Sequence, residues 1–592
     1  MCGICGELSF SQQQPERHHI ELMLQTLKRR GPDAEGVYED RGIALGHRRL
    51  AIIDLSSRSH QPMVDHSLFL TIVFNGTIYN YRELRTQLQE KGYSFFSSGD
   101  TEVILKAYAE WGDACVNHFI GMFAFAIWDS RRRELFMARD RLGIKPLYYN
   151  LSPTGLRFAS NVQALLKYTD VDRSIDPIAL HHHLTLHAVV PAPRTLLQGV
   201  RKLPPATWMR VLPDGSCQSG EYWSLNQLGE ITDKSADQWQ EEIHQALKLA
   251  VKRRLDAADV PVGVLLSGGL DSSLLVALLA EQNVQDLHTF SVGFEDQPEE
   301  SGNEFFYSDQ VVARYQTLHK KFVIPNSEVL KTLPDCIANM SEPMVGQDAV
   351  AFYLLSQRVS QDIKVVQSGQ GADEVFGGYF WYPLIHQEKT GTAVERFAKY
   401  YFDRSHEEFL ETVSPAFHGL DHTRALVEER LNAYHDVELL QAVLRFDVST
   451  LIVDDPVKRV DNMTMAWGLE ARVPFLDHEL VELAAQMPIS LKLASGGKHI
   501  LKNIARTLLP ATVVDRPKGY FPMPALKYVR GEFLHWMKRI LLSEACRNRG
   551  LFNPQYVAKL LADPSAYLTT IKGNKLWHLA LLEAWLQHHV DT

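Results

Sequence analysis

Short apolar runs separated by turn residues fill the first third of the chain. Four clear runs lie at 43–45, 68–74, 122–128 and 135–139. Turn signals such as Arg-Gly-Pro-Asp and Asn-Gly stand between the runs, as expected for strands. Helical periodicity interrupts this pattern near 21–30 and 101–111. Together these patterns predict an α+β domain with packed antiparallel sheets at residues 1–215.

The pattern changes in the rest of the chain. Helix-periodic stretches alternate with apolar runs at 262–266, 286–292 and 363–367, and the sequence reads as mostly helical after about residue 395. Such alternation predicts an α/β domain with a parallel sheet and a helical C-terminal part at 238–592. The polar stretch between the two parts, 216–237, is the predicted linker.

Composition narrows the class of protein. Of 592 residues, 45% are hydrophobic and 22% charged, and the net charge is −10. An acidic balance disfavours nonspecific binding to nucleic acid. No apolar run approaches the roughly 20 residues of a membrane span, and the N-terminus lacks a signal-peptide pattern. Six cysteines are too few for a disulfide framework. We therefore expect a cytoplasmic protein with no nucleic-acid or membrane partner.

Two short motifs resemble parts of metal sites. Cys2-x-x-Cys5 has no second Cys pair or nearby His cluster to complete a site. The His tract at 181–183 lies in the helix-like segment 178–186. We expect that tract to be a surface run rather than a metal site.

Cys2 is the strongest candidate for a nucleophile. Methionine aminopeptidases remove an initiator Met before a small residue, so Cys2 would become the N-terminus. It would then carry a thiol and an α-amine with a pKa of roughly 7.7–8.0, which can accept the thiol proton directly or through water. Taken alone, Cys2 also fits an ordinary small hydrophobic residue. The remaining motifs favour the nucleophile.

A glycine-rich loop is the second strong signal. An apolar run enters Ser267-Gly268-Gly269, and a helix-like stretch follows from Ser272. Glycines let backbone N–H groups approach phosphate oxygens, and the helix N-terminus adds a positive dipole. No Lys follows the glycines, so this is not a Walker loop, and Asp271 supplies a carboxylate suited to Mg²⁺. The string resembles the loop of ATP pyrophosphatases, which form acyl-adenylates.

Cys2 and this loop in one chain resemble glutamine-dependent asparagine synthetases, and the likeness covers essentially the whole chain. The motifs that carry it lie at 30–33, 47–50, 75–76, 99–102, 121–125, 138–143, 262–273, 368–374, 469–477 and 498–501. The resemblance implies an N-terminal nucleophile domain with an αββα sandwich, followed by an ATP-pyrophosphatase domain. It implies ATP and Mg²⁺ as cofactors and small-molecule partners: glutamine, ATP and a carboxylate acceptor. A homodimer is also possible.

The family implies a glutaminase site around Cys2. Its thiolate would attack the glutamine side-chain amide, and the Asn75 amide and the Gly76 N–H would hold the oxyanion. Arg49 would pair with the substrate α-carboxylate, and Asp100 with its α-ammonium.

The family also implies a synthetase site at the glycine-rich loop. Asp271 and Asp373 would hold Mg²⁺, and Lys498 would neutralise the departing pyrophosphate. The ATP contacts implied by the resemblance are Leu265, Ser267, Gly268, Gly269, Asp271, Ser272, Val292, Ser368 and Gly369.

Two positions depart from the family pattern. Thr77 stands where the family usually has a Glu that helps to bind the glutamine α-ammonium, so Asp100 would carry more of that role. Gln370 replaces a Glu that lies near the reacting acyl group, and Gln cannot act as a base. We keep Gln370 among the catalytic candidates because its amide could donate to a peptide carbonyl.

The departures fit one subgroup better than a plain asparagine synthetase. It comprises the N-acetylglutaminylglutamine amidotransferases, and the resemblance rests on 186–195, 341–345, 366–371, 379–383 and 516–522. A blocked dipeptide calls for a large pocket with little charge. The aromatic run 379–382 could wall that pocket or pack the core. An asparagine synthetase using aspartate is the alternative, and an adenylating ligase of the β-lactam-synthetase type or a non-enzymatic binding protein fits less well, because Cys2 is present.

Overall fold

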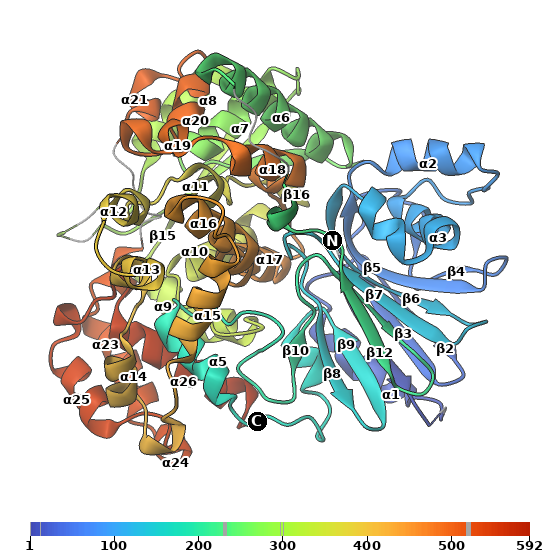
Figure 1. Ribbon diagram of the computed structural model, residues 1–592, viewed down its shortest axis with the longest axis horizontal. Coiled ribbons are helices and arrows are strands. Elements are labelled where there is room, and N and C mark those ends of the chain that lie inside the picture. Colours follow the sequence, from blue (N-terminus) through green and yellow to red (C-terminus); the bar gives the residue numbers. More distant parts are fainter. Residues whose placement is uncertain are drawn as a thin grey trace.

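Two parts of different architecture make up the molecule (Figure 1). The computed structural model describes residues 2–11, 13–228, 234–296, 298–299, 301–516 and 523–591. The N-terminal strands, coloured blue to green, gather at the right of the figure, and the helices from α6 onward fill the left and the top.

Two antiparallel sheets form the N-terminal part. Their strand orders are β10-β8-β9-β1-β3-β2 and β12-β11-β7-β6-β5-β4. The strands are β1 (Gly3–Ser9), β2 (Ala34–Asp40), β3 (Ile43–Arg49), β4 (Met63–Asp65), β5 (Leu70–Ile78), β6 (Gly121–Asp129), β7 (Glu134–Arg139), β8 (Tyr148–Ser152), β9 (Gly155–Ala159), β10 (Arg201–Lys202), β11 (Thr207–Val211) and β12 (Cys217–Glu221). The covering helices are α1 (Arg17–Thr26), α2 (Tyr81–Glu90), α3 (Asp100–Trp111), α4 (Val162–Leu165) and α5 (Pro177–Thr185).

The alternating side chains of β1 show how the helical and sheet layers of the N-terminal part pack. Ile4 packs in the core between the two sheets, whereas its neighbour Cys5 packs with Ile20 of α1. Successive side chains of a strand point to opposite faces, so one apolar run supplies both cores. Helix α3 packs against β5 in the same way on the other side of the sandwich. The αββα arrangement of an N-terminal nucleophile domain is therefore confirmed.

The boundaries of individual elements differ from the predicted ones. The helix predicted near 21–30 spans Arg17–Thr26, because the chain turns toward Gly31 and Pro32 after Thr26. Strand β12 pairs with β11, so the second sheet continues into the range 216–237 that we predicted as linker. Residues 229–233 of that range lie outside the described residues. The division into domains stays a prediction.

A five-stranded parallel sheet forms the centre of the second part, with the order β15-β14-β13-β16-β17. The strands are β13 (Val262–Leu265), β14 (His288–Phe294), β15 (Leu318–Ile324), β16 (Val365–Gln367) and β17 (Glu470–Arg472). In the last pair Val365 lies opposite Glu470 and Gln367 opposite Arg472. The three strands predicted from apolar runs, and the parallel sheet itself, are confirmed.

Helices surround this sheet and build the C-terminal part. They are α6 (Ala236–Asp256), α7 (Leu270–Ala280), α8 (Phe305–Tyr315), α9 (Asn326–Ala338), α10 (Asp348–Val359), α11 (Ala372–Phe376), α12 (Trp381–Gln387), α13 (Ala393–Tyr401), α14 (His406–Thr412), α15 (His422–Asn432), α16 (Leu439–Phe446), α17 (Lys458–Met465), α18 (His478–Gln486), α19 (Ile489–Leu493), α20 (His499–Ala505), α21 (Ala511–Val514), α22 (Pro524–Lys527), α23 (Gly531–Leu541), α24 (Glu544–Arg549), α25 (Pro554–Ala562) and α26 (Lys575–His589).

Buried ion pairs join the two parts. Asp461 of α17 accepts from Arg30 at 2.9 Å and from Lys145 at 3.0 Å, and the three side chains are at most 7% exposed. Lys202 pairs with Asp454 at 2.7 Å and is equally buried. A buried charge without its partner is strongly destabilising, so these contacts fix how the two parts meet.

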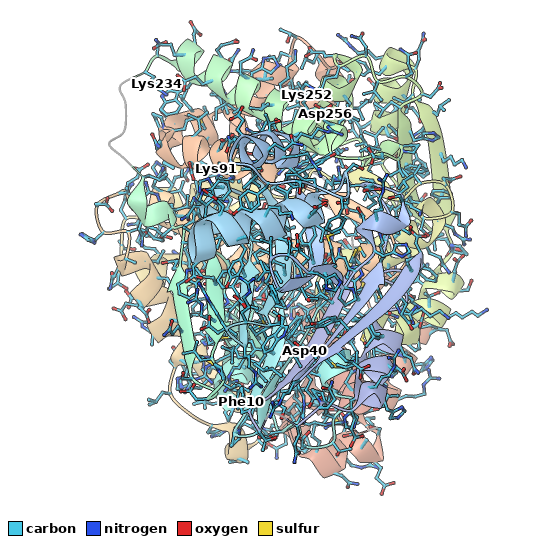
Figure 2. The ribbon with its side chains drawn as sticks, turned by 90° about the vertical axis from the view of Figure 1, so that its right-hand side faces the viewer. Phe10, Asp40, Lys91, Lys234, Lys252 and Asp256 are labelled. Carbon is cyan, nitrogen blue, oxygen red and sulfur yellow. The ribbon has the colours of Figure 1, made fainter. Side chains whose placement is uncertain are left out.

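Figure 2 looks onto the N-terminal part from the side. Phe10 and Asp40 lie toward one end of the sheets, and Lys252 and Asp256 of α6 lie at the other. At that end Arg82 of α2 donates to the Asp256 carbonyl at 2.9 Å. Helix α6 therefore contacts the N-terminal domain as well as its own sheet.

The prediction for the His tract was wrong. Helix α5 is where we expected it, but His181, His182 and His183 are at most 5% exposed. The Thr423 hydroxyl lies 2.6 Å from His181 Nδ1 and 3.0 Å from His182 Nδ1, so α15 covers the tract.

Among the described residues, no helix has the length and apolar character that crossing a membrane requires.

Candidate active sites

Cys2 lies at the start of β1, buried between the two parts of the molecule. Its side chain is 8% exposed, and its N–H donates to Asn75 Oδ1 at 3.1 Å. Arg30 Nε donates to the Cys2 carbonyl at 3.2 Å. Burial raises the pKa of the thiol, while the Leu50 N–H and Arg49 oppose that rise. A buried thiol of this kind needs a nearby base to become a thiolate.

Asn75 and Gly76 lie beside Cys2 on β5. Because Asn75 Oδ1 accepts from Cys2, its Nδ2 is the donor side, and Nδ2 has no hydrogen-bond partner among the described residues. A Cβ at Gly76 would lie 2.2 Å from the Met122 carbonyl oxygen of β6. Only glycine therefore fits where β5 and β6 approach each other. The pair presents a free amide donor to the space next to the thiol.

Arg49 and Asp100 flank this space. Arg49 is 5% exposed and donates to the carbonyl of Ser56 at 2.9 Å and to that of Asp54. These backbone contacts fix the guanidinium, and no carboxylate of the described residues forms an ion pair with it. Asp100, the first residue of α3, accepts from the Ile78 N–H at 3.0 Å, and burial raises its pKa to about 6. Arg49 lies close enough to Cys2 to lower the pKa of its thiol, and Asp100 contacts Ile78 at the end of the strand that carries Asn75.

The second part of the molecule adds a carboxylate that we did not predict from the sequence. Thr77 Oγ1 donates to Glu470 Oε1 of β17 at 3.4 Å, and Glu470 is fully buried. Burial disfavours its charge, but Arg472 Nε, 2.5 Å away, lowers the Glu470 pKa to about 2. The charge of Glu470 also raises the pKa of Asp100. A negative charge from the synthetase sheet therefore stands next to the position where Thr replaces Glu.

The glycine-rich loop connects β13 to α7 in the predicted way. Ser267 and Ser272 hydroxyls lie 3.1 Å apart, and Gly269 N–H donates to Ser267 Oγ at 3.2 Å. Gly268 has a φ of 75°, and a Cβ there would lie 2.7 Å from the Ser308 nitrogen. The tight turn therefore requires glycine and leaves the α7 N-terminus facing the cavity described below.

Three charged side chains meet beside this loop. Lys498 Nζ lies 2.6 Å from Asp271 Oδ2 and 2.8 Å from Asp373 Oδ1. Burial would lower the Lys498 pKa, but the two carboxylates raise it above its ordinary value. A Cβ at Gly378 would lie 2.1 Å from Asp373 Oδ1 and 2.2 Å from Lys498 Cε. Two carboxylates that converge on one cation are the oxygen donors that Mg²⁺ prefers, so these residues fit the implied metal.

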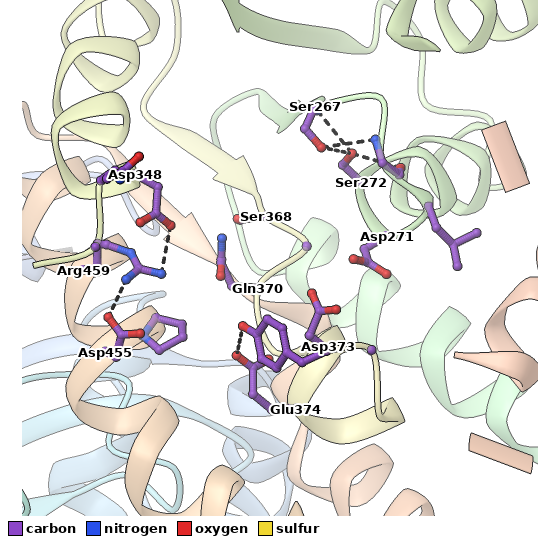
Figure 3. A pocket seen from close by; sticks show the side chains of 18 of the residues that line it. Ser267, Asp271, Ser272, Asp348, Ser368, Gln370, Asp373, Glu374, Asp455 and Arg459 are labelled. Atoms are coloured by element: carbon purple, nitrogen blue, oxygen red, sulfur yellow. Dashed lines mark hydrogen bonds and ion pairs between the residues drawn. The ribbon is translucent and has the colours of Figure 1, made fainter. Parts of the chain in front are cut away.

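One cavity of about 450 Å³ gathers these groups (Figure 3). The predicted residues that line it are Leu265, Ser267, Gly269, Asp271, Ser272, Val292, Ser368, Gly369, Gln370, Asp373 and Lys498. Gly268 shapes the loop but does not line the cavity. Figure 3 shows Gln370 in the middle, with Asp271 on one side and Arg459 on the other. The structure thus brings the predicted synthetase residues together.

The aromatic run after Gln370 has a divided role. Tyr379 and Trp381 line the cavity with their rings stacked 4.2 Å apart. Tyr382 is fully buried and donates to Asp447, and Phe380 packs against the same apolar cluster. Alternate residues of the run therefore wall the cavity and pack the core. The Tyr379 hydroxyl also donates to Glu374 Oε1 at 2.7 Å. Figure 3 shows Glu374 below Gln370.

A stripe of residues missed by sequence reasoning lines the far wall. Asp447, Leu451, Asp455 and Arg459 follow one another at every fourth position, and all four line the cavity. They come from π-helical turns (Asp447–Leu451 and Val453–Val457) and the start of α17. An α-helix has 3.6 residues per turn and the π-turn is wider, which keeps every fourth residue on one face. The i, i+4 spacing of charges was the signal available in the sequence.

Parts of the subgroup resemblance fall beyond the described residues. Of the motif 516–522, only Arg516 is described, and it donates to the Gly268 carbonyl at 3.1 Å. Met1 is also outside the described residues, so its removal stays a prediction.

Comparison with known proteins matches both parts of the chain. The model of the Asparagine synthase family covers residues 242–587, and that of the Glutamine amidotransferase domain covers 1–223. The glutamine-hydrolyzing asparagine synthetase 1 of Bacillus subtilis (strain 168) is 31% identical over 100% of this chain and 97% of its own length. The glutamine-hydrolyzing asparagine synthetase B of Escherichia coli (strain K12) is 30% identical over 88% of this chain and 82% of its own.

These matches agree with the architecture. The amidotransferase match ends just after β12, and the synthase match begins within α6. The relatives are named for carbon–nitrogen bond formation with nitrogen taken from glutamine, and this chain is a ligase of that kind. The likeness over the full chain and the two sites it contains lead to one conclusion: the protein belongs to the asparagine synthase family, in its glutamine-hydrolysing form.

Proposed function

We propose that this enzyme adenylates a carboxylate acceptor with ATP, releases pyrophosphate, and converts the adenylate to an amide with ammonia from glutamine. We propose N-acetylglutaminylglutamine as the acceptor. The observation that carries the reaction type is the meeting of Lys498, Asp271 and Asp373 beside a glycine-rich loop without a Walker Lys. The family to which the chain belongs uses ATP.

In the first half-reaction, Cys2 is the nucleophile. The α-amine takes the thiol proton, and the thiolate attacks the side-chain carbonyl carbon of glutamine. Asn75 Nδ2 and the Gly76 N–H donate to the oxyanion, an interaction typically worth a factor of about 10²–10³ per donor. Collapse of the tetrahedral intermediate expels ammonia and leaves a thioester, which water hydrolyses to glutamate. Arg49 and Asp100 hold the amino-acid end of glutamine.

In the second half-reaction, the loop at Ser267 and Gly269 holds the phosphates of ATP. Asp271 and Asp373 would hold Mg²⁺, which supplies charge neutralisation for the pyrophosphate. An acceptor carboxylate oxygen attacks the α-phosphorus, and the bond to the β-phosphate oxygen breaks. Lys498 stabilises the negative charge that develops on the leaving group. Ammonia then attacks the acyl carbon, AMP leaves, and an amide forms.

Two observations support the blocked dipeptide. Gln370, in the middle of the cavity, offers an amide rather than a carboxylate to a peptide carbonyl, and Tyr379 and Trp381 offer aromatic walls. A chain of amides fits a cavity whose polar groups both donate and accept hydrogen bonds.

Aspartate is the second candidate acceptor, and one observation favours it. Arg459 lies between Asp348 and Asp455 at the far wall. A guanidinium flanked by carboxylates can hold the α-carboxylate and α-ammonium of a free amino acid. A ligase of the β-lactam-synthetase type is less well supported, because Cys2 and the groups around it are present.

Mass spectrometry of product mixtures tests both acceptors. The enzyme is incubated with ATP, glutamine and either N-acetylglutaminylglutamine or aspartate, and nucleotide products are measured alongside. We expect AMP, pyrophosphate and the dipeptide amide, with kcat/KM for the dipeptide far above that for aspartate. Efficient asparagine formation without dipeptide turnover would replace the first candidate with the second. ADP as the main nucleotide product would exclude the adenylate mechanism.

A further inference from the structure

The far wall of the cavity has the construction of a binding subsite. Arg459 is 6% exposed, and its Nη2 lies 2.8 Å from Asp348 Oδ2 while its Nη1 contacts Asp455. Its Nε–H has no hydrogen-bond partner among the described residues. A guanidinium has five N–H donors, and the two carboxylates are placed to engage only part of that set. The two ion pairs fix the orientation of the group on the cavity wall. Because Nε is buried, the remaining Nη hydrogens are the ones that can face a ligand.

Glycine makes room for this arrangement. A Cβ at Gly346 would lie 2.3 Å from Arg459 Nη1 and 2.8 Å from Asp348 Oδ1. The guanidinium therefore occupies the space that any other side chain at this position would need. A side chain at position 346 would therefore force the ends of Arg459 and Asp348 to move.

His187 adds a second fixed donor to the same wall. It lines the cavity, and its Nδ1 lies 3.1 Å from Oδ2 of the fully buried Asp403. Burial alone would lower the His187 pKa, but Asp403 raises it above its ordinary value. With Nδ1 held by Asp403, Nε2 is the nitrogen available to a ligand. His187 and Ala188 have φ values of 53° and 63°, a strained backbone of a kind that recurs at functional sites.

The wall is also separate from the groups that handle phosphate. Figure 3 shows Asp348, Arg459 and Asp455 on the opposite side of Gln370 from Asp271 and Ser267. An acceptor whose reacting carboxyl lies beside the nucleotide would extend past Gln370 toward this wall. The carboxylates accept N–H groups there, and Arg459 and His187 donate to oxygens.

Accepting the proposed function, we propose that His187, Asp348, Asp455 and Arg459 form the subsite that binds the end of the acceptor remote from its reacting carboxyl. The ligand chemistry is an N–H donor next to a carbonyl or carboxylate oxygen. A blocked dipeptide offers both in its peptide and acetamide groups, and aspartate offers both in its α-ammonium and α-carboxylate.

The test uses the full enzyme with His187→Gln and Asp348→Asn, assayed separately with N-acetylglutaminylglutamine and with aspartate. The control is Asp170→Asn, which removes a carboxylate paired with Arg157 on the surface of the N-terminal domain. Loss of a hydrogen bond to a charged group should raise the KM for the acceptor roughly 10- to 100-fold. The KM for ATP and the rate of glutamate release should stay at wild-type values. The acceptor whose KM rises identifies which molecule the subsite holds.

A Gly346→Ala variant provides a check that removes no charge. Its Cβ would push Arg459 aside, so the KM for the acceptor should rise while glutamate release is unchanged. An acceptor KM within twofold of wild type in all three variants overturns the subsite. If the wild-type enzyme releases AMP with neither acceptor, the proposed function itself is overturned. The two failures can be told apart because this one is seen in an enzyme whose subsite is intact.

Discussion

The two candidate active sites of this enzyme are built in different ways. The proposed glutaminase site lies on neighbouring strands of one sandwich, and its cation, Arg49, is held by backbone carbonyls of a short loop. The synthetase cavity collects charged side chains from segments more than 200 residues apart, and Lys498 contacts Asp271 directly. One site has its polar groups fixed by backbone, the other by opposed charges.

The two kinds of construction should respond differently to substitution. A group fixed by backbone keeps its place when a neighbouring charge changes, so single substitutions should affect one chemical role at a time. A group fixed by opposed charges moves when its partner is neutralised. Four experiments test this contrast.

Cys2→Ala should abolish glutamine-dependent synthesis and leave ammonia-dependent synthesis intact. The thiol has no role in adenylation, and Asn75 and Arg49 do not depend on it for their positions. Paired assays with glutamine and with ammonium, together with the intact mass of the wild-type protein, provide the measurement. Loss of ammonia-dependent turnover in a folded variant would contradict the separation of the two sites.

Asp271→Asn or Asp373→Asn should lower the rate of AMP formation by roughly 10²–10³. Each change removes a proposed Mg²⁺ ligand and also one of the carboxylates that position Lys498. AMP and pyrophosphate release at increasing Mg²⁺ concentration gives the measurement, and glutamate release is the internal control. Wild-type AMP formation in either variant would contradict the assignment.

Asp461→Asn should lower the free energy of unfolding by about 3–5 kcal/mol, because it leaves two buried cations without their carboxylate. Thermal unfolding gives the measurement. Asp335→Asn is the matched control, since Asp335 pairs with Arg29 across the same two parts while both side chains are nearly half exposed. An exposed pair is typically worth no more than about 1 kcal/mol, so equal shifts in the two variants would contradict the argument.

The pH dependence of glutamine use should report on Asp100. Its pKa is raised to about 6 by burial, so in the free enzyme the carboxyl is protonated below that pH and ionised above it. Only the ionised form pairs with the glutamine α-ammonium. Below pH 6, kcat/KM for glutamine should therefore lose a further factor of about ten per pH unit, beyond the loss caused by protonation of the Cys2 α-amine. Asp100→Asn should remove this inflection at a lower overall value. An Asp100→Asn profile that runs parallel to the wild-type profile between pH 5 and 7 would count against the role of Asp100.

Elements that local rules determine could be predicted from the sequence. Apolar runs predicted both sheet types, and the glycines around Gly268 predicted a tight turn between a strand and a helix. The role of Asn75 came from the family resemblance, and that role, like the nucleophilic role of Cys2, stays a prediction. The far wall of the cavity was not predictable in this way. Arg459 and His187 come together only through the path of the chain, and the π-helical turns that align Asp455 with Arg459 have no local signal apart from the spacing.

The His tract and Glu470 also show what a local sequence pattern cannot predict. The sequence of residues 178–186 contains no signal that α15 covers them. We therefore predicted that this polar tract is exposed. Glu470 was read as part of a motif of the second part, yet its carboxylate contacts Thr77 in the first. Burial and contacts between parts are properties of the packed molecule, and periodicity within one segment does not contain them.

The short pairing of β16 with β17 fixes the position of one candidate site relative to the other. On one side of that ladder the chain leaves β16 directly into the loop that carries Gln370 and Asp373, and Ser368 N–H donates to the Arg472 carbonyl at 2.8 Å. On the other side β17 presents Glu470 to the glutaminase strand. A slip of one residue would turn every side chain of β17 to the opposite face. The register of three residue pairs therefore fixes where Glu470 lies relative to Gln370 and Asp373. An insertion or deletion in either strand would displace groups of both sites at once.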